Sequence, residues 1–138
     1  MKVPFNINLS GKTAIVTGGS GTLCSAMAYG LAVSGAKVAI IGRNIEKLAS
    51  VSEKLTKNAL DEYNKDVTIK GYSCNVINKD ELTAAYETIK NELGSCDILI
   101  NGAGGNQPGA ITSIEMLKKD KEDSDYSFWN LDEDRIRD

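Results

Sequence analysis

Three observations in the sequence predict an α/β protein with a doubly wound parallel sheet. Short runs rich in β-branched residues alternate with longer stretches of helical periodicity as far as residue 100. The apolar runs are continuous, which is typical of strands that are covered on both faces. A glycine-rich turn joins the first apolar run to the first helical stretch. Right-handed crossovers with a switch point after the first strand predict the strand order 3-2-1-4.

The first strand, its turn and the start of the first helix are expected within Thr13–Cys24. Ile15 and Val16 are β-branched and apolar, as a buried strand requires. Three glycines then permit positive φ angles and let another molecule approach the backbone closely: Gly18, Gly19 and Gly21. Residues at helical spacing predict the buried stripe of the first helix: Leu23, Ala26, Met27, Gly30, Leu31 and Ser34. Gly35 can end that helix.

Three further strands are expected at residues 36–41, 67–72 and 97–100. After residue 105 the alternation is lost, and we expect residues 106–126 to form a mobile surface loop.

Two asparagines mark the starts of the second and third helices. Asn44 is a good N-cap, and Asn78 with Glu81 three residues later resembles a capping box. The second helix is expected to bury the face made by Ile45, Leu48, Ser52, Leu55 and Ala59. The third is expected to bury the face made by Leu82, Ala85, Tyr86, Ile89 and Leu93.

Length and composition exclude several classes of protein. The 138 residues suit a single domain, 1–138, and a net charge of −3 argues against a nucleic-acid surface. No apolar run reaches the about 18–20 residues of a membrane span. Three separated cysteines without any histidine favour neither a disulfide framework nor a zinc site, and they suit a reducing cytoplasm. A catalytic triad with an imidazole base is excluded as well.

The glycine turn has two interpretations, one as a ligand-binding site and one as a structural turn. A helix that opens directly after such a turn presents free N–H groups and its positive dipole end, which suits a pyrophosphate. Gly18 would allow the tight exit from the strand, and the Ser20 hydroxyl could donate to the phosphates. The alternative is a purely structural turn; the position after the first strand of an alternating chain favours a dinucleotide-binding domain.

Three motifs together resemble those of the short-chain dehydrogenase/reductases. These are Thr17–Cys24, Asn75-Val76 and Asn101–Gly104, and the resemblance runs from about Leu9 to Gly105. It implies a Rossmann-type fold and an NAD or NADP cofactor. The family's first motif is Thr-Gly-x-x-x-Gly-x-Gly, in which this chain replaces the last two glycines by Thr22 and Cys24.

Three short segments resemble the D-mannonate oxidoreductase (fructuronate reductase) branch of that family: Gly21–Ala28, Gly42-Arg43-Asn44 and Ile100–Asn106. Gly42 stands where an NAD-preferring site usually has an acidic residue, and Arg43 could pair with a 2′-phosphate or stack on the adenine. NADP is therefore favoured, with NAD kept open by the mannonate branch. The alternative for Arg43 is an ordinary exposed arginine near a helix start.

The resemblance assigns roles to two further loops. Asn75 takes the place of an Asp that commonly holds the adenine amino group, and Asn101 mainly braces the sheet beside the nicotinamide ribose. Gly102 replaces the second Asn of the family's Asn-Asn-Ala-Gly motif. The complete predicted cofactor site is Gly18, Ser20, Gly21, Thr22, Leu23, Arg43, Asn44, Asn75, Val76, Asn101, Gly102, Ala103 and Gly104.

No catalytic residue is predicted in this chain. The family uses a Ser and a Tyr-x-x-x-Lys pair beyond the Asn-Ala-Gly motif, whereas the spacing match here, Tyr86 to Lys90, precedes Asn101 and lies on a predicted core face. The chain thus resembles the N-terminal half of a homo-oligomeric enzyme that exchanges hydride with a secondary alcohol or ketone such as D-mannonate or D-fructuronate. By itself it is expected to be inactive. The alternative is a non-catalytic nucleotide-binding or interaction module from a truncated reading frame.

Overall fold

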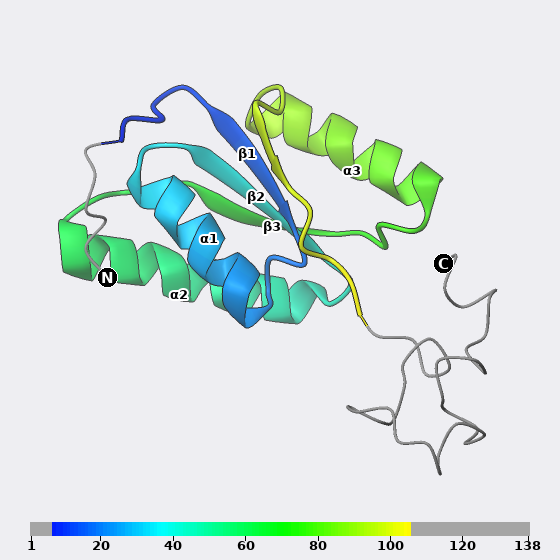
Figure 1. The fold of residues 1–138 in the computed structure, drawn as a ribbon, viewed down its shortest axis with the longest axis horizontal. Helices are drawn as coiled ribbons and strands as arrows, with labels where there is room; N and C mark the ends of the chain where they lie inside the picture. The colour runs from blue at the N-terminus through cyan, green and yellow to red at the C-terminus, as the bar shows by residue number, and fades with distance from the viewer. Residues whose placement is uncertain (1–6, 106–138) are drawn as a thin grey trace, which may run out of the picture. The chain divides into compact units, whose positions relative to one another are not determined.

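A computed structural model describes residues 7–105 of the chain. They contain a four-stranded parallel sheet in the order β3-β2-β1-β4, so the predicted fold class and strand order are confirmed (Figure 1). The strands are β1 (Thr13–Thr17), β2 (Lys37–Gly42), β3 (Ile69–Ser73) and β4 (Ile98–Ile100). The helices are α1 (Thr22–Val33), α2 (Ile45–Tyr63) and α3 (Lys79–Glu92).

The helices cover the two faces of the sheet separately. Side chains of α1 and α2 pack with Ala14, Val16 and Ile40 on one face, whereas α3 packs against Ile15 and Ile41 on the other (Figure 1). Alternate residues of the central strands therefore enter different cores, which explains why these strands are apolar throughout. Burying each such isoleucine contributes roughly 1.5–3 kcal/mol.

The predicted buried stripe of α1 is wrong. Leu23 is 74% exposed and Met27 46% exposed. The face that enters the core is instead Cys24, Ala28, Tyr29, Ala32 and Val33. Because α1 carries no charged residue, its sequence offers more than one apolar stripe, and packing against the sheet and α2 selects this one.

The N-caps predicted for α2 and α3 are confirmed. The Asn44 Oδ1 accepts from the Lys47 backbone N–H at 2.8 Å, and the Asn78 Oδ1 accepts from the first turn of α3. Ile45 was expected on the buried face of α2 but is exposed, because that face begins at Leu48.

The compact unit that holds the sheet spans residues 1–103, and residues 104–138 form a second unit, of which Gly104 and Gly105 are described. The predicted loop at 106–126 lies outside the described residues. No helix within residues 7–105 combines the length and the apolar character needed to cross a membrane.

Candidate functional site

The predicted site residues cluster where the strands end. All four strands are parallel, so the loops after β1, β2, β3 and β4 leave the same, carboxyl edge of the sheet. Those loops, together with the first two residues of α1, carry every predicted site residue between positions 18 and 103. Gly104 is exposed and belongs to the second unit. Ligands of open α/β sheets bind at this edge, beside the point where the strand order reverses.

Gly18 makes the sharp turn out of β1. Its φ is +66°, and a Cβ built on it would lie 2.7 Å from the Gly102 carbonyl oxygen and 2.9 Å from the Ala103 nitrogen. The Gly21 N–H closes the turn by donating to the Gly18 carbonyl at 2.9 Å. Glycine is therefore required at position 18 both for its φ and for the close approach of a second loop.

Gly19 and Gly21 do not use the positive φ angles that their sequence allows. A Cβ on Gly19 would lie 2.5 Å from the Ile40 Cβ, and the Gly19 N–H donates to the Ile41 carbonyl at 3.2 Å. Gly19 thus lets the turn pack directly onto β2. Sequence reasoning left it out of the site, and only the packing of the two strands reveals its role.

The start of α1 offers backbone donors at the surface. Gly21 is the N-cap, and no side chain within the described range accepts a hydrogen bond at that cap. Thr22 and Leu23 follow it and are exposed. The first N–H groups of an α-helix have no partner within the helix, so this end can bind an anion.

Thr17 ties the tip of β1 to the loop after β4. Its Oγ1 accepts hydrogen bonds from the backbone N–H groups of Gly102 and Ala103, both at 3.0 Å. The Thr17 side chain is buried although it is polar. Sequence reasoning placed Thr17 in the motif but not in the site, because the bonds join positions more than 80 residues apart.

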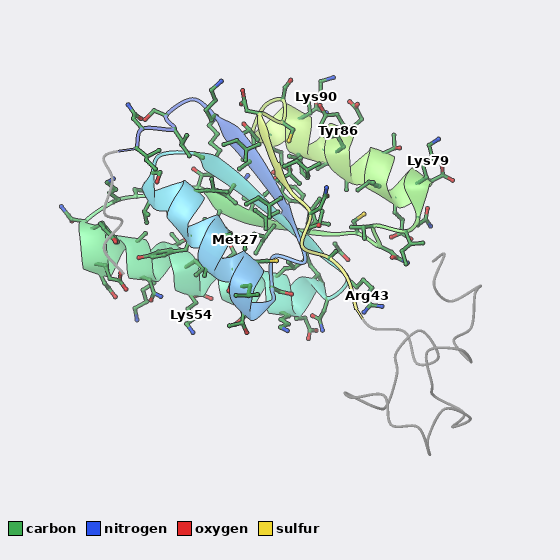
Figure 2. The ribbon with its side chains drawn as sticks, viewed as in Figure 1. Met27, Arg43, Lys54, Lys79, Tyr86 and Lys90 are labelled. Carbon is green, nitrogen blue, oxygen red and sulfur yellow. The ribbon has the colours of Figure 1, made fainter. Side chains whose placement is uncertain are left out.

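The tip of β2 faces the glycine turn. A Cβ on Gly42 would lie 3.7 Å from the Ser20 Oγ, so these two residues are neighbours. Arg43 is exposed, and its guanidinium makes no ion pair with any residue in the range 7–105. Asn44 has its side-chain oxygen engaged at the start of α2. Among residues 7–105, Arg43 is thus a cation at the carboxyl edge with no carboxylate partner (Figure 2).

The loop after β3 is fixed by a small polar network. The Asn75 Oδ1 accepts from the Ile77 N–H at 3.3 Å, while the Asn75 N–H donates to a Glu81 carboxylate oxygen at 2.9 Å. The other oxygen of Glu81 accepts from the Asn78 side chain at 2.9 Å. This differs from a standard capping box, in which the glutamate accepts from the N-cap backbone N–H. Val76 packs against the core under α3.

Tyr86 and Lys90 lie apart from these loops. Both belong to α3, where Tyr86 is half-buried against the core and Lys90 lies 4.0 Å from the Glu87 carboxylate. Figure 2 shows the pair along α3 and Arg43 at the end of the sheet. The expectation that Tyr86 faces the core is confirmed.

A hollow of about 540 Å³ opens elsewhere, at the edge of β3 between α2 and α3. Beside it, the Glu92 carboxylate accepts hydrogen bonds from Lys70 at 3.0 Å and from the Tyr72 hydroxyl at 2.9 Å. The Lys70 ammonium, with the Tyr72 hydroxyl, holds the pKa of Glu92 below its usual value. None of the predicted site residues lines this hollow. The candidate site is therefore taken at the carboxyl edge of the sheet, where those residues lie.

Comparison with known proteins agrees with this geometry. The family model for the short chain dehydrogenases matches residues 12–124. The chain belongs to the short-chain dehydrogenase family. This short-chain dehydrogenase sequence is 43% identical over 131 residues to the uncharacterized oxidoreductase UxuB of Bacillus subtilis (strain 168), covering 95% of this chain and 44% of the relative.

Two solved structures resemble this short-chain dehydrogenase. One is a Haemophilus influenzae protein with bound NAD, provisionally assigned as a D-mannonate oxidoreductase; it has a TM-score of 0.74 and 35% identity over 96% of this chain and 45% of its own. The other is a metagenomic short-chain oxidoreductase in complex with NADP, with a TM-score of 0.64 and 27% identity over 82% of this chain and 47% of its own. The chain therefore spans less than half the length of the relatives it matches, and those relatives include both NAD and NADP complexes.

Proposed function

We propose that this chain is the cofactor-binding half of an NAD(P)-dependent oxidoreductase that transfers hydride between the nicotinamide and a secondary alcohol or ketone of sugar-acid type, such as D-mannonate and D-fructuronate. Family membership supports the oxidoreductase class. The Haemophilus neighbour, provisionally assigned as a D-mannonate oxidoreductase, supports the sugar-acid substrate.

The observation that carries the proposal is the bare backbone between β1 and α1. Gly18 turns at φ +66°, Gly21 leaves the start of α1 without a side-chain cap, and the next two residues are exposed. Gly18, Gly19 and Gly21 place no side chain in this turn, so anionic phosphates can approach the main chain. The N–H groups of Thr22 and Leu23 and the hydroxyl of Ser20 would hold the pyrophosphate.

The remaining site residues would hold the two ends of the dinucleotide. Gly42 removes the acidic charge that would repel a 2′-phosphate, and the exposed guanidinium of Arg43 can bind one, so we favour NADP over NAD. Asn75 and Val76, with Asn44 at the start of α2, would lie on the adenine side. The residues proposed on the nicotinamide side follow β4 in the chain: Asn101, Gly102, Ala103 and Gly104.

The nicotinamide, when bound, would supply the hydride donor or acceptor. The described residues would bind and orient it, and we assign proton transfer to none of them. Tyr86 is held on α3 against the core, so we propose that turnover needs groups that the 138-residue chain by itself does not supply. Turnover by the 138-residue chain that survives Tyr86→Phe would contradict this and indicate another catalytic group.

A second candidate is a non-catalytic interaction module. Within the described residues β4 pairs only with β1, and Leu99 is 57% exposed beside this open edge. A discrete species of the 138-residue chain that binds no dinucleotide but self-associates in sedimentation would favour this candidate.

Binding of NADPH and NADH to the chain tests the proposal. We expect titration followed by nicotinamide fluorescence to show tighter binding of NADPH. Arg43→Ala should weaken NADPH binding roughly tenfold, the loss of about one charge-assisted contact, and should leave NADH nearly unchanged. Lys54→Ala is the matched control, because Lys54 is an exposed cation on α2 that lies outside the predicted site (Figure 2). Binding of neither nucleotide would overturn the proposed function, and equal effects of both substitutions would overturn the role of Arg43.

A further inference from the structure

Cys24 and Gly102 occupy the same small space from two different loops. Cys24 lies in the first turn of α1 with its side chain in the core, and Gly102 lies two residues beyond β4. A Cβ built on Gly102 would collide with the Cys24 Sγ, while it would lie 3.6 Å from the Cys24 Cβ. Of the two Cys24 side-chain atoms, the sulfur and not the Cβ would therefore clash with a side chain at position 102.

The φ angle of Gly102 gives no reason for glycine. Its φ lies outside the left-handed region, since the positive-φ glycines of the described part are Gly11, Gly18, Gly35 and Gly94. The second neighbour of its built Cβ is the Thr17 carbonyl oxygen at 3.0 Å, a tight contact with a strand backbone atom that adds to the conflict with the sulfur. Thus the Cys24 sulfur is the largest, though not the sole, steric reason for glycine at position 102.

The two residues are also two of the places where this chain departs from the motifs of its family. Position 24 holds a cysteine where Thr-Gly-x-x-x-Gly-x-Gly has its last glycine, and position 102 holds a glycine where Asn-Asn-Ala-Gly has its second asparagine. One departure adds a side chain and the other removes one at the same point of contact.

Gly102 is held from a second direction as well. Its N–H donates to the Thr17 Oγ1, as does the N–H of Ala103, each at 3.0 Å. Thr17 thereby draws the 101–103 segment toward the tip of β1, while the Cys24 sulfur limits how near that segment can come to α1.

We propose that Cys24 and Gly102 are a matched pair of positioning residues that sets the distance between the start of α1 and the 101–103 segment. That distance decides how the pyrophosphate side of the site sits relative to its nicotinamide side. The cofactor part of this inference depends on the proposed function, whereas the steric match between the two residues does not.

A double-substitution cycle on the 138-residue chain tests the match. Gly102→Ala should lower Tm by roughly 5–15 °C, as overpacking does in a domain of this size. Cys24→Ala removes the sulfur but keeps the Cβ. In the Cys24→Ala background, Gly102→Ala should therefore lower Tm by clearly less than it does in the unsubstituted chain, with the contact to the Thr17 carbonyl oxygen accounting for the loss that remains. Gly30→Ala is the control, because Gly30 lies in α1 and a Cβ there meets nothing within 4 Å. Additive Tm changes in the cycle would overturn the match.

Ligand binding separates positioning from stability alone. Gly102→Ala should weaken NADH binding about tenfold, but should leave the binding of ADP, which lacks the nicotinamide half, within about twofold. Adding Cys24→Ala should restore NADH affinity. Equal losses for NADH and ADP would overturn the positioning role. If the unsubstituted chain binds neither ligand, the proposed function and the positioning role both fail, and the Tm cycle still decides the steric match.

Discussion

Replacing Gly18 with alanine should destabilise the chain more than the same replacement at any open glycine. An alanine at φ +66° costs about 1–2 kcal/mol. Its Cβ would also lie within 3.0 Å of backbone atoms of Gly102 and Ala103, which cannot rotate away as a side-chain end could. The 101–103 segment must therefore move from Thr17, at a cost of about 0.5–1.5 kcal/mol for each of the two hydrogen bonds that it makes there. The expected loss is about 2–5 kcal/mol in total.

Gly11→Ala isolates the backbone contribution. Gly11 has a similar φ of +80°, but a Cβ built on it meets nothing within 4 Å. It should therefore cost only the about 1–2 kcal/mol of the left-handed conformation. Urea unfolding followed by far-UV circular dichroism measures both variants. If Gly18→Ala and Gly11→Ala lose the same free energy of unfolding, the close approach of the two loops is not a constraint and the reasoning is refuted.

Two further predictions concern the ends of β1. Thr17→Val keeps the shape of the side chain but removes the acceptor for the N–H groups of Gly102 and Ala103, so it should lower the free energy of unfolding in urea by about 1–3 kcal/mol. Thr17→Ser keeps the hydroxyl and should retain most of the stability. A loss in the serine variant as large as in the valine variant would contradict the role of the hydroxyl. Asp97 accepts from the Lys12 ammonium and from a β1 backbone N–H, and these two hydrogen bonds hold the pKa of its carboxyl below its usual value. A carboxyl whose pKa is lowered by folding stabilises the folded state at pH values above its unfolded pKa of about 3.9, and this stability is lost as the pH falls through its folded pKa. Asp97→Asn should therefore lower Tm at neutral pH, and the Tm difference between the variant and the unsubstituted chain should vanish in acid. A Tm difference that stays constant from neutral pH to below the folded pKa would show that the charge of Asp97 contributes nothing.

The sequence by itself determined the alternation of strands and helices, from which the crossover rule predicts the strand order, together with the N-caps of α2 and α3 and the motifs that the chain shares with its family. These depend on local chemistry: a continuous apolar run of strand length, an asparagine before a helical pattern, or glycines after the first strand. Such signals act within a few residues, so they survive without knowledge of the rest of the fold. The carboxyl edge could also be predicted, because parallel strands necessarily bring the loops after them together.

Only the tertiary structure decided which face of α1 is buried and how the loops after β1 and β4 meet. An uncharged helix such as α1 has several apolar stripes, and contact with the sheet chooses among them. The bonds from Thr17 to the 101–103 segment, and the fit of Cys24 against Gly102, join residues that are more than 75 positions apart. No local pattern records such a contact, because it depends on two loops arriving at one point with matching volumes.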